Sequence, residues 1–175
     1  GKFSSLNIDT VLGKIRRLVK DNVSEVNVIG QDITGYGLDL YGKLKLSWLL
    51  KKIIKEGKDI GWIRLLYLYP NRITDDLLEL IRDEPKICKY IDLPIQHINE
   101  SILKLMRRGI SKSRVLTLVD KIRKTIPNVA LRTSIIAGFP SETDKEFKEL
   151  LNFLEDTRFE RLGAFIYSRE EGTDA

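Results

Sequence analysis

The feature that most constrains the fold of this chain is a regular alternation of short β-rich segments with amphipathic helical segments. The β-rich segments are predicted to start near residues 23, 62, 90, 129 and 161. The segments between them carry apolar residues at three- and four-residue spacing, which predicts helices with one buried face. This alternation is typical of right-handed βαβ crossovers and a parallel sheet. Because five strands cannot close an eight-stranded barrel, we expect an α/β fold with an open sheet or a partial barrel.

The composition fits one globular domain spanning residues 1–175. No segment approaches the ~20 uninterrupted apolar residues of a membrane helix, and the N-terminal residues lack the apolar centre of a signal peptide. We therefore expect a cytoplasmic location and no membrane partner. The formal net charge of +5 leaves contact with RNA or a ribosome open, although solvated helix faces are the favoured explanation.

Neither end of the sequence is expected to be a natural terminus of the protein. The chain opens on a helix that starts at Asn7 or Asp9, with no strand before it. It ends on EGTDA directly after the last strand, with no covering helix. A β/α protein should have a strand ahead of its first helix, so we expect the chain to be the middle of a longer protein.

Polar residues at the starts of the helical segments predict where the helices begin. Thr143 with Glu146 three residues later forms a capping box. The other predicted caps are Thr74, Asn99, and either Ser111 or Ser113.

Several classes of site are excluded or disfavoured. Cys88 and His97 are the single cysteine and histidine, so the chain cannot form an internal disulfide or hold a structural zinc by four such ligands. The sequence contains no phosphate-binding loop, dinucleotide fingerprint or nucleophile elbow. We expect Cys88 to be a buried small hydrophobe. A hydrogen-bonding role is expected for His97 in preference to catalysis.

In parallel β/α folds, ligands bind at the carboxyl ends of the strands, and polar groups follow every predicted strand here. Within this set, Asp32 has a second interpretation as a turn stabiliser. Arg132 requires a partner if its side chain points into a barrel, and either Asp92 or Glu142 could serve. The candidates in chain order are Gly30, Gln31, Asp32, Tyr67, Tyr69, Asn71, Arg72, Gln96, His97, Gly138, Phe139, Glu142 and Tyr167.

Five stretches of the chain together resemble a known family. They are VNVIGQDITGYGLDLYGK, IRLLYLYP, YIDLPIQHINESILKLMRR, LRTSIIAGFPSET and FIYSREEGTDA. Across essentially the whole chain, the sequence resembles the radical S-adenosylmethionine methylthiotransferases. Within that family it is similar to the RimO-type branch, because PIQH at 94–97 and YSREEGT at 167–173 differ from the tRNA-modifying MiaB-type branch.

The resemblance implies an open six-stranded β/α barrel of the TIM type whose first strand, with a C-x-x-x-C-x-x-C loop, precedes Gly1. Those cysteines would hold a 4Fe–4S cluster that binds S-adenosylmethionine. An N-terminal cluster domain and a C-terminal TRAM domain would also lie outside this chain. The implied reaction is a radical methylthiolation of an aspartate in a small-subunit ribosomal protein. The isolated chain is then expected to be an inactive fragment of a transferase.

The resemblance also implies which residues meet the cofactor, with no catalytic or metal-ligating residue among them. Gly30, Gln31 and Asp32 occupy the place where the cofactor's amino group binds, although the sequence departs from the usual Gly-Gly-Glu. The remaining expected contacts are Gln96, Arg132, Ser134, Gly138 and Tyr167. Two alternatives stay open: a tRNA methylthiotransferase of the same chemistry, and a cluster-free β/α protein that binds a nucleotide or scaffolds a partner.

Overall fold

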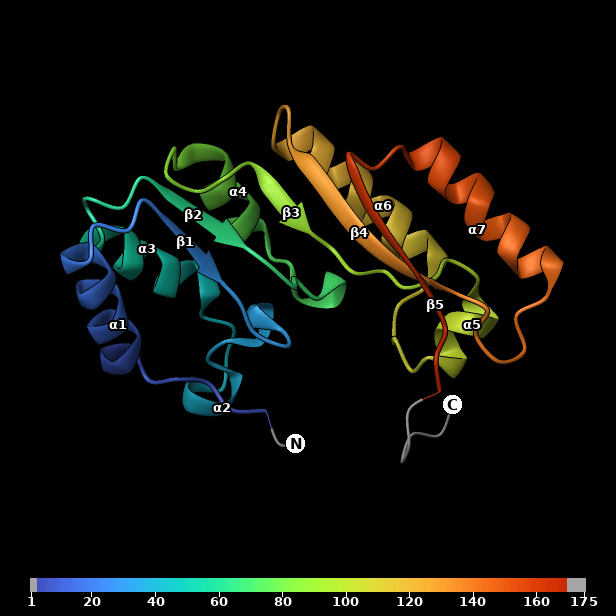
Figure 1. Cartoon of the computed structure of the whole chain (residues 1–175), viewed down its shortest axis with the longest axis horizontal. Coiled ribbons are helices and arrows are strands. Elements are labelled where there is room, and N and C mark those ends of the chain that lie inside the picture. Colours follow the sequence, from blue (N-terminus) through green and yellow to red (C-terminus); the bar gives the residue numbers. More distant parts are fainter. Residues whose placement is uncertain (1–2, 170–175) are drawn as a thin grey trace.

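The strands form a curved, all-parallel arrangement in the computed structural model, which describes residues 3–169. All five predicted strands are present within two residues of their predicted starts, as Figure 1 shows. They are β1 (Glu25–Val28), β2 (Trp62–Leu65), β3 (Tyr90–Asp92), β4 (Ala130–Ala137) and β5 (Arg161–Ile166).

The strands follow one another in space in chain order. β1 pairs with β2, and β3, β4 and β5 pair in that order, all in parallel. The two sheets are joined beside β2, where Ile63 bridges to Ile87 and the Leu68 N–H donates to the Asp92 carbonyl at 3.0 Å. In the described part of the chain, β1 and β5 do not pair with each other, so the barrel is open. The predicted α/β fold with an open partial barrel is confirmed.

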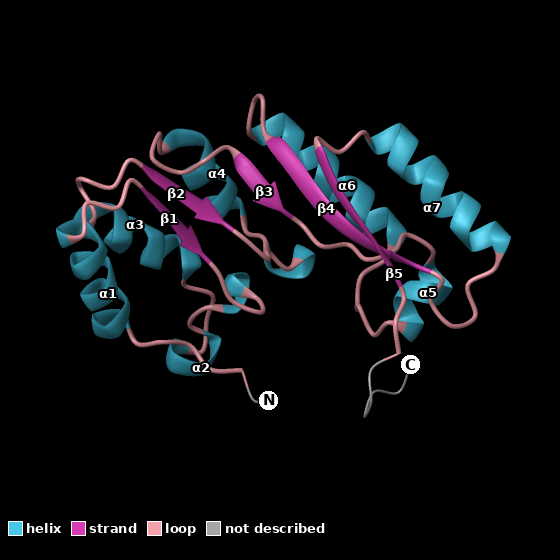
Figure 2. Ribbon diagram, in the orientation of Figure 1, coloured by secondary structure: helices cyan, strands magenta, loops and turns pink. Residues whose placement is uncertain are grey.

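Helices connect the strands and pack side by side, α1 against α3, α3 against α4, and α4 against α6. Figure 2 shows the long helices outside the arch of strands. No helix among residues 3–169 has the length and apolar character needed to cross a membrane. The helices are α1 (Ile8–Lys20), α2 (Leu38–Tyr41), α3 (Leu46–Glu56), α4 (Asp75–Asp83), α5 (Glu100–Leu105), α6 (Lys112–Thr125) and α7 (Asp144–Thr157), with 3-10 turns at Ile33–Gly35 and Pro70–Arg72.

Most predicted helix starts are confirmed in their atomic detail. Asn7, Asn99 and Ser111 each accept a backbone N–H of the helix that they precede. Thr143 and Glu146 form the predicted reciprocal capping box. Thr74 occupies its predicted cap position but makes no capping hydrogen bond. Its hydroxyl bonds the Asp76 carboxylate instead and lowers the pKa of that group.

Residues alternate between the two faces of the sheet along each strand. One face is apolar and packs in the core, with Val26, Ile63, Leu65, Ile91, Leu131 and Ile135 all buried. The opposite face carries ionisable side chains that bridge neighbouring strands. Arg64 bonds Glu25 at 2.8 Å and lies over the Tyr90 ring, with its guanidinium carbon 5.0 Å from the ring centroid. The inner face of the open barrel is therefore polar.

Candidate functional site

Three successive strands end at a residue with a left-handed backbone. Tyr67 after β2 has φ 58°, Gln96 after β3 has φ 74°, and Gly138 after β4 has φ 76°. This conformation costs a residue with a side chain roughly 1–2 kcal/mol. Such backbone strain concentrates at functional sites, where the surrounding structure maintains it. The carboxyl ends of the strands are therefore the candidate site.

The segment after β1 contributes Gly30, Gln31 and Asp32. Gly30 and Gln31 are exposed, and they border a cavity of about 520 Å³ between β1, α1 and α3. The Asp32 carboxylate is engaged within the chain: it accepts the Thr34 N–H at 3.0 Å and pairs with Arg72. The turn-stabilising interpretation of Asp32 thus matches its contacts.

Arg132 lies on the polar inner face of β4 and bonds the neighbouring strand. Its guanidinium donates to Asp92 at 2.6 Å, while the other Asp92 oxygen accepts the Tyr67 N–H at 3.1 Å. The Asp92 side chain is 2% exposed and that of Arg132 is 31% exposed. Of the two partners left open by the sequence, Asp92 is therefore the one used. Arg132 has both an ion pair and a solvent-facing surface.

Ser134 and Gln96 are joined through their backbones where β3 and β4 end. The Gln96 N–H donates to the Ser134 carbonyl at 2.9 Å, and the Gln96 carbonyl accepts the Ile136 N–H at 2.8 Å. Ser134 is buried and shares a face of β4 with Arg132. The structure therefore places three of the expected cofactor residues next to one another.

Glu142 fixes the turn that follows β4. One of its oxygens accepts the N–H of Gly138 at 2.5 Å and of Phe139 at 3.0 Å. Its other oxygen lies 3.3 Å from His97 Nε2. His97 Nδ1 accepts the Asn99 N–H at 2.9 Å, so the ring proton sits on Nε2. The hydrogen-bonding role expected for His97 is confirmed.

Gly138 and Tyr167 border the same strand end. The positive φ of Gly138 alone accounts for a glycine, since a methyl group built there would meet no atom of residues 3–169 within 4 Å. The Tyr167 ring packs edge-to-face on Phe139 with centroids 5.3 Å apart. The Tyr167 hydroxyl is buried and lacks a hydrogen-bond partner among the described residues. The backbone of Gly138 is therefore uncovered by the described side chains, and the aromatic rings of Phe139 and Tyr167 lie next to it.

Sequence reasoning did not single out two features of the site. Arg72 was among the strand-end residues, but its pairing with Asp32 spans 40 residues and has no local signal. Arg108 belongs to the connection between α5 and α6, yet it reaches the ends of β2 and β3. Its one sequence signal is a pair of cations before Gly109 in a short interhelical segment.

The described residues do not supply a metal centre. Among residues 3–169, no three side chains of His, Cys, Asp or Glu are grouped so that they could hold a metal ion. Cys88 is the single cysteine of the chain, so a cluster bound by three thiolates does not fit the residues of this chain.

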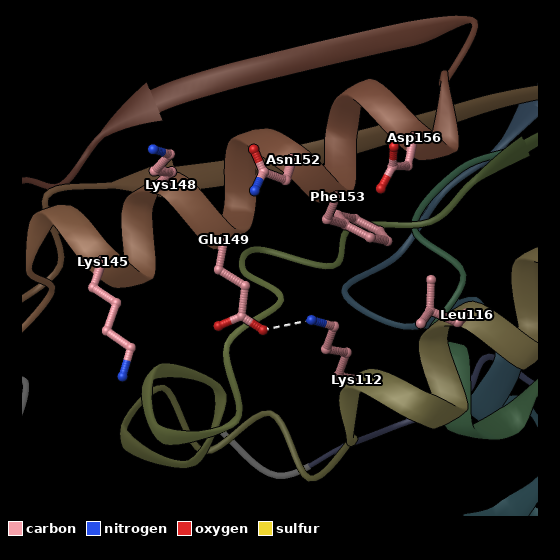
Figure 3. Close-up of a pocket in the computed structure, with 8 residues that line it drawn as sticks. All are labelled: Lys112, Leu116, Lys145, Lys148, Glu149, Asn152, Phe153 and Asp156. Carbon is pink, nitrogen blue, oxygen red and sulfur yellow. Dashed lines mark hydrogen bonds and ion pairs between the residues drawn. The ribbon is translucent and has the colours of Figure 1, made fainter.

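A second hollow lies on the outer side of the sheet. Figure 3 shows this groove of about 370 Å³ between α6 and α7, where Lys112 bonds Glu149 at 2.6 Å. Glu149 also accepts Asn99 Nδ2 at 2.7 Å, which ties α7 to the start of α5. Glu149 thus connects the groove, through Asn99, to the network around His97.

The comparisons with known proteins agree with this fold. The family model described as the Radical SAM superfamily matches residues 1–154. The chain belongs to this superfamily.

Two of the most similar curated relatives share one protein name. The chain is 51% identical over 175 residues to "Ribosomal protein uS12 methylthiotransferase RimO" of Citrifermentans bemidjiense, covering 100% of this chain and 39% of that protein. It is 53% identical over 174 residues to the protein of the same name in Geotalea uraniireducens, covering 99% and 38%. The chain thus spans well under half the length of these relatives. The expected resemblance to the RimO-type methylthiotransferases is confirmed.

Two solved structures share the fold at low sequence identity. The radical S-adenosylmethionine methyltransferase TsrM from Kitasatospora setae, with cobalamin and a [4Fe-4S] cluster bound, superposes with TM-score 0.71 at 13% identity and covers 94% of this chain and 31% of its own. Coproporphyrinogen III oxidase HemN from Escherichia coli, a radical SAM enzyme, gives TM-score 0.70 at 18% identity, covering 93% and 38%. These likenesses support the fold and carry no conclusion about substrate.

Proposed function

We propose that this chain is the core of a radical S-adenosylmethionine methylthiotransferase that modifies an aspartate of the small-subunit ribosomal protein uS12. The observation that carries the proposal is the 51% identity over the whole chain to a protein named for that activity. The relatives favour the ribosomal protein over tRNA as substrate.

The proposed cofactor site is the set of strand ends. S-adenosylmethionine would lie across them, with its amino group near Gly30 and Gln31 and its adenine against Gly138. Asp32 orients the first of these segments through Arg72, and Asp92 orients Arg132. The remaining proposed contacts are Gln96, Ser134 and Tyr167. The strained backbone at Gln96 supports this placement.

The 4Fe–4S cluster would be held by thiolates outside this chain, in a strand and loop ahead of residue 1. The free edge of β1 supports this arrangement, since β1 pairs with β2 alone among residues 3–169. The cavity beside that edge is lined by α1 and α3 side chains such as Ile15 and Leu49. An N-terminal cluster domain and a C-terminal TRAM domain complete the proposed protein.

Contact with RNA or the ribosome belongs to the same proposal. The groove between α6 and α7 is lined by Lys145 and Lys148, together with the Lys112–Glu149 pair (Figure 3). Lysines on such a surface suit an RNA backbone around a ribosomal protein. A ribosomal substrate would also place the reaction in the cytoplasm.

The test is reductive cleavage of S-adenosylmethionine by the full-length protein after anaerobic reconstitution with iron and sulfide. The proposal predicts a brown protein that forms 5′-deoxyadenosine when reduced. It also predicts that residues 1–175 alone form none. A full-length protein that binds no cluster and cleaves no cofactor would instead favour a cluster-free β/α binding protein.

A further inference from the structure

The connection between α5 and α6 crosses the strand ends and is tied down there. Arg107 and Gly109 both adopt left-handed backbones, with φ 54° and 61°. The Tyr69 hydroxyl donates to the Arg108 carbonyl, and Asn71 Nδ2 donates to the Gly109 carbonyl at 2.7 Å. These bonds hold the segment over the end of β2.

The Arg108 side chain points inward from this segment. One guanidinium nitrogen donates to the Pro94 carbonyl at 2.5 Å, just beyond β3. The guanidinium carbon lies 5.5 Å from the centre of the Tyr69 ring. Arg108 Nε is buried and has no hydrogen-bond partner in the part of the chain that the structure describes. The guanidinium is therefore positioned, but its hydrogen-bonding capacity is not filled.

Among residues 3–169, Arg108 also lacks the carboxylate partner that three other arginines on or beside the strands have. Arg64 pairs with Glu25, Arg72 with Asp32, and Arg132 with Asp92. Within residues 3–169, by contrast, no carboxylate lies within 4.0 Å of the Arg108 guanidinium nitrogens. Burial lowers the pKa of Arg108, which reflects the cost of holding this charge away from water.

A desolvated cation without an anion is expensive, and one carbonyl and an aromatic face compensate it only in part. The flat guanidinium fork is complementary to a carboxylate, which can accept two parallel N–H bonds. None of the Arg108 contacts involves a proposed cofactor residue, since they go to Tyr69 and Pro94. Pro94 precedes Gln96 by two residues, so a carboxylate bound at Arg108 would lie beside the proposed cofactor site.

We propose that Arg108, held against Tyr69 and the Pro94 carbonyl, is the receptor for an acidic side chain of the protein substrate. The role of Arg108 as a carboxylate receptor follows from its contacts, and only the identity of the substrate, uS12, rests on the proposed function. The carboxylate would pair with the guanidinium and supply the missing charge. Arg108 would then select an acidic residue over its amide counterpart.

The first arm measures binding of uS12 to the full-length protein without turnover, using uS12 and a form whose acceptor aspartate is asparagine. Arg108→Gln is expected to weaken binding of uS12 that retains its acceptor aspartate roughly ten- to 100-fold. The asparagine form should bind wild-type protein about as weakly and lose nothing further in R108Q. Arg108→Lys keeps the charge and should retain part of the preference. Arg114→Gln, the same change at an exposed position on α6, should bind like wild type.

The second arm needs neither uS12 nor catalysis. The NMR signal of the Arg108 Nε–H, assigned by its loss in R108Q, should shift when N-acetylaspartate amide is added. N-acetylasparagine amide should leave it unmoved. If this shift occurs while uS12 does not bind wild-type protein, the role of Arg108 as a carboxylate receptor is supported. The identity of the substrate as uS12 is then rejected. Equal responses to both probes, or equal loss of both uS12 forms in R108Q, would overturn the receptor.

Discussion

Glu142 and His97 are hydrogen-bonded to each other in the interior, with side chains 3% and 0% exposed. They come from segments 45 residues apart and meet where β3 and β4 end. Through its second oxygen, Glu142 holds the N–H groups of Gly138 and Phe139. The turn proposed to meet the adenine is therefore shaped by a buried pair behind it.

Replacing Glu142 by Gln should loosen this turn. The amide can accept from Gly138 and Phe139, but its NH2 then faces the Nε2–H of His97, so a buried donor is left unpaired. Such a loss costs about 1–3 kcal/mol. Amide hydrogen exchange in the full-length protein should accelerate across residues 136–143. Glu155→Gln, an exposed change on α7, is the matched control. Unchanged exchange in E142Q would contradict the role given to this pair.

Gly138 and Gly42 make a matched pair for testing the adenine position. Both have positive φ, 76° and 68°, and a methyl group at either site would meet no atom within 4 Å. Alanine at each position should cost a similar roughly 1–2 kcal/mol of folding free energy. Affinity for S-adenosylmethionine, measured by equilibrium dialysis, should fall in G138A alone. Equal affinities in both variants would argue against a ligand at Gly138.

Breaking the pair between Arg132 and Asp92 from one side should be worse than removing both charges. Arg132→Met leaves the buried Asp92 carboxylate with the Tyr67 N–H as its remaining bond. The cost should stay below the roughly 3–5 kcal/mol of a fully buried pair, because Arg132 is 31% exposed. Adding Asp92→Asn should recover part of the lost stability in urea unfolding. A double variant less stable than R132M would show that the pair is not the main interaction.

Glu149 should make the stability of the helix layer acid-sensitive. Hydrogen bonds from Lys112 and then Asn99 lower its pKa below the usual 4.5. A lowered native pKa contributes stability above 4.5 that is lost as the pH falls through the native value. Glu149→Gln should therefore flatten the decline in unfolding free energy below pH 4.5, followed by fluorescence of Trp48 and Trp62. An unchanged slope would show that the Lys112 bond contributes little.

The strands and most helix starts follow from local patterns that the sequence displays. The capping box at Thr143 is an example, since both of its partners lie within one turn. The short helix α2 was not predicted. It is too short to be stable alone, and contacts from Ser5 to Asp39 and Gly37 stabilise it.

The site was predictable as a set of strand ends, because a parallel sheet brings those ends together. Individual partners were not. Arg132 pairs with Asp92 because these two residues are in register on adjacent strands, which no spacing in the sequence reveals. Glu142, the other candidate partner, is committed to Gly138 and His97. The roles of the eight proposed cofactor residues stay predictions.

The most direct test of the central claim is the product formed by the reconstituted full-length protein. It is reduced and supplied with S-adenosylmethionine, uS12 and tRNA together, and both macromolecules are analysed by mass spectrometry. The account predicts uS12 carrying one methylthio group in place of hydrogen on an aspartate, and unchanged tRNA. A methylthio group on tRNA with unmodified uS12 would contradict it.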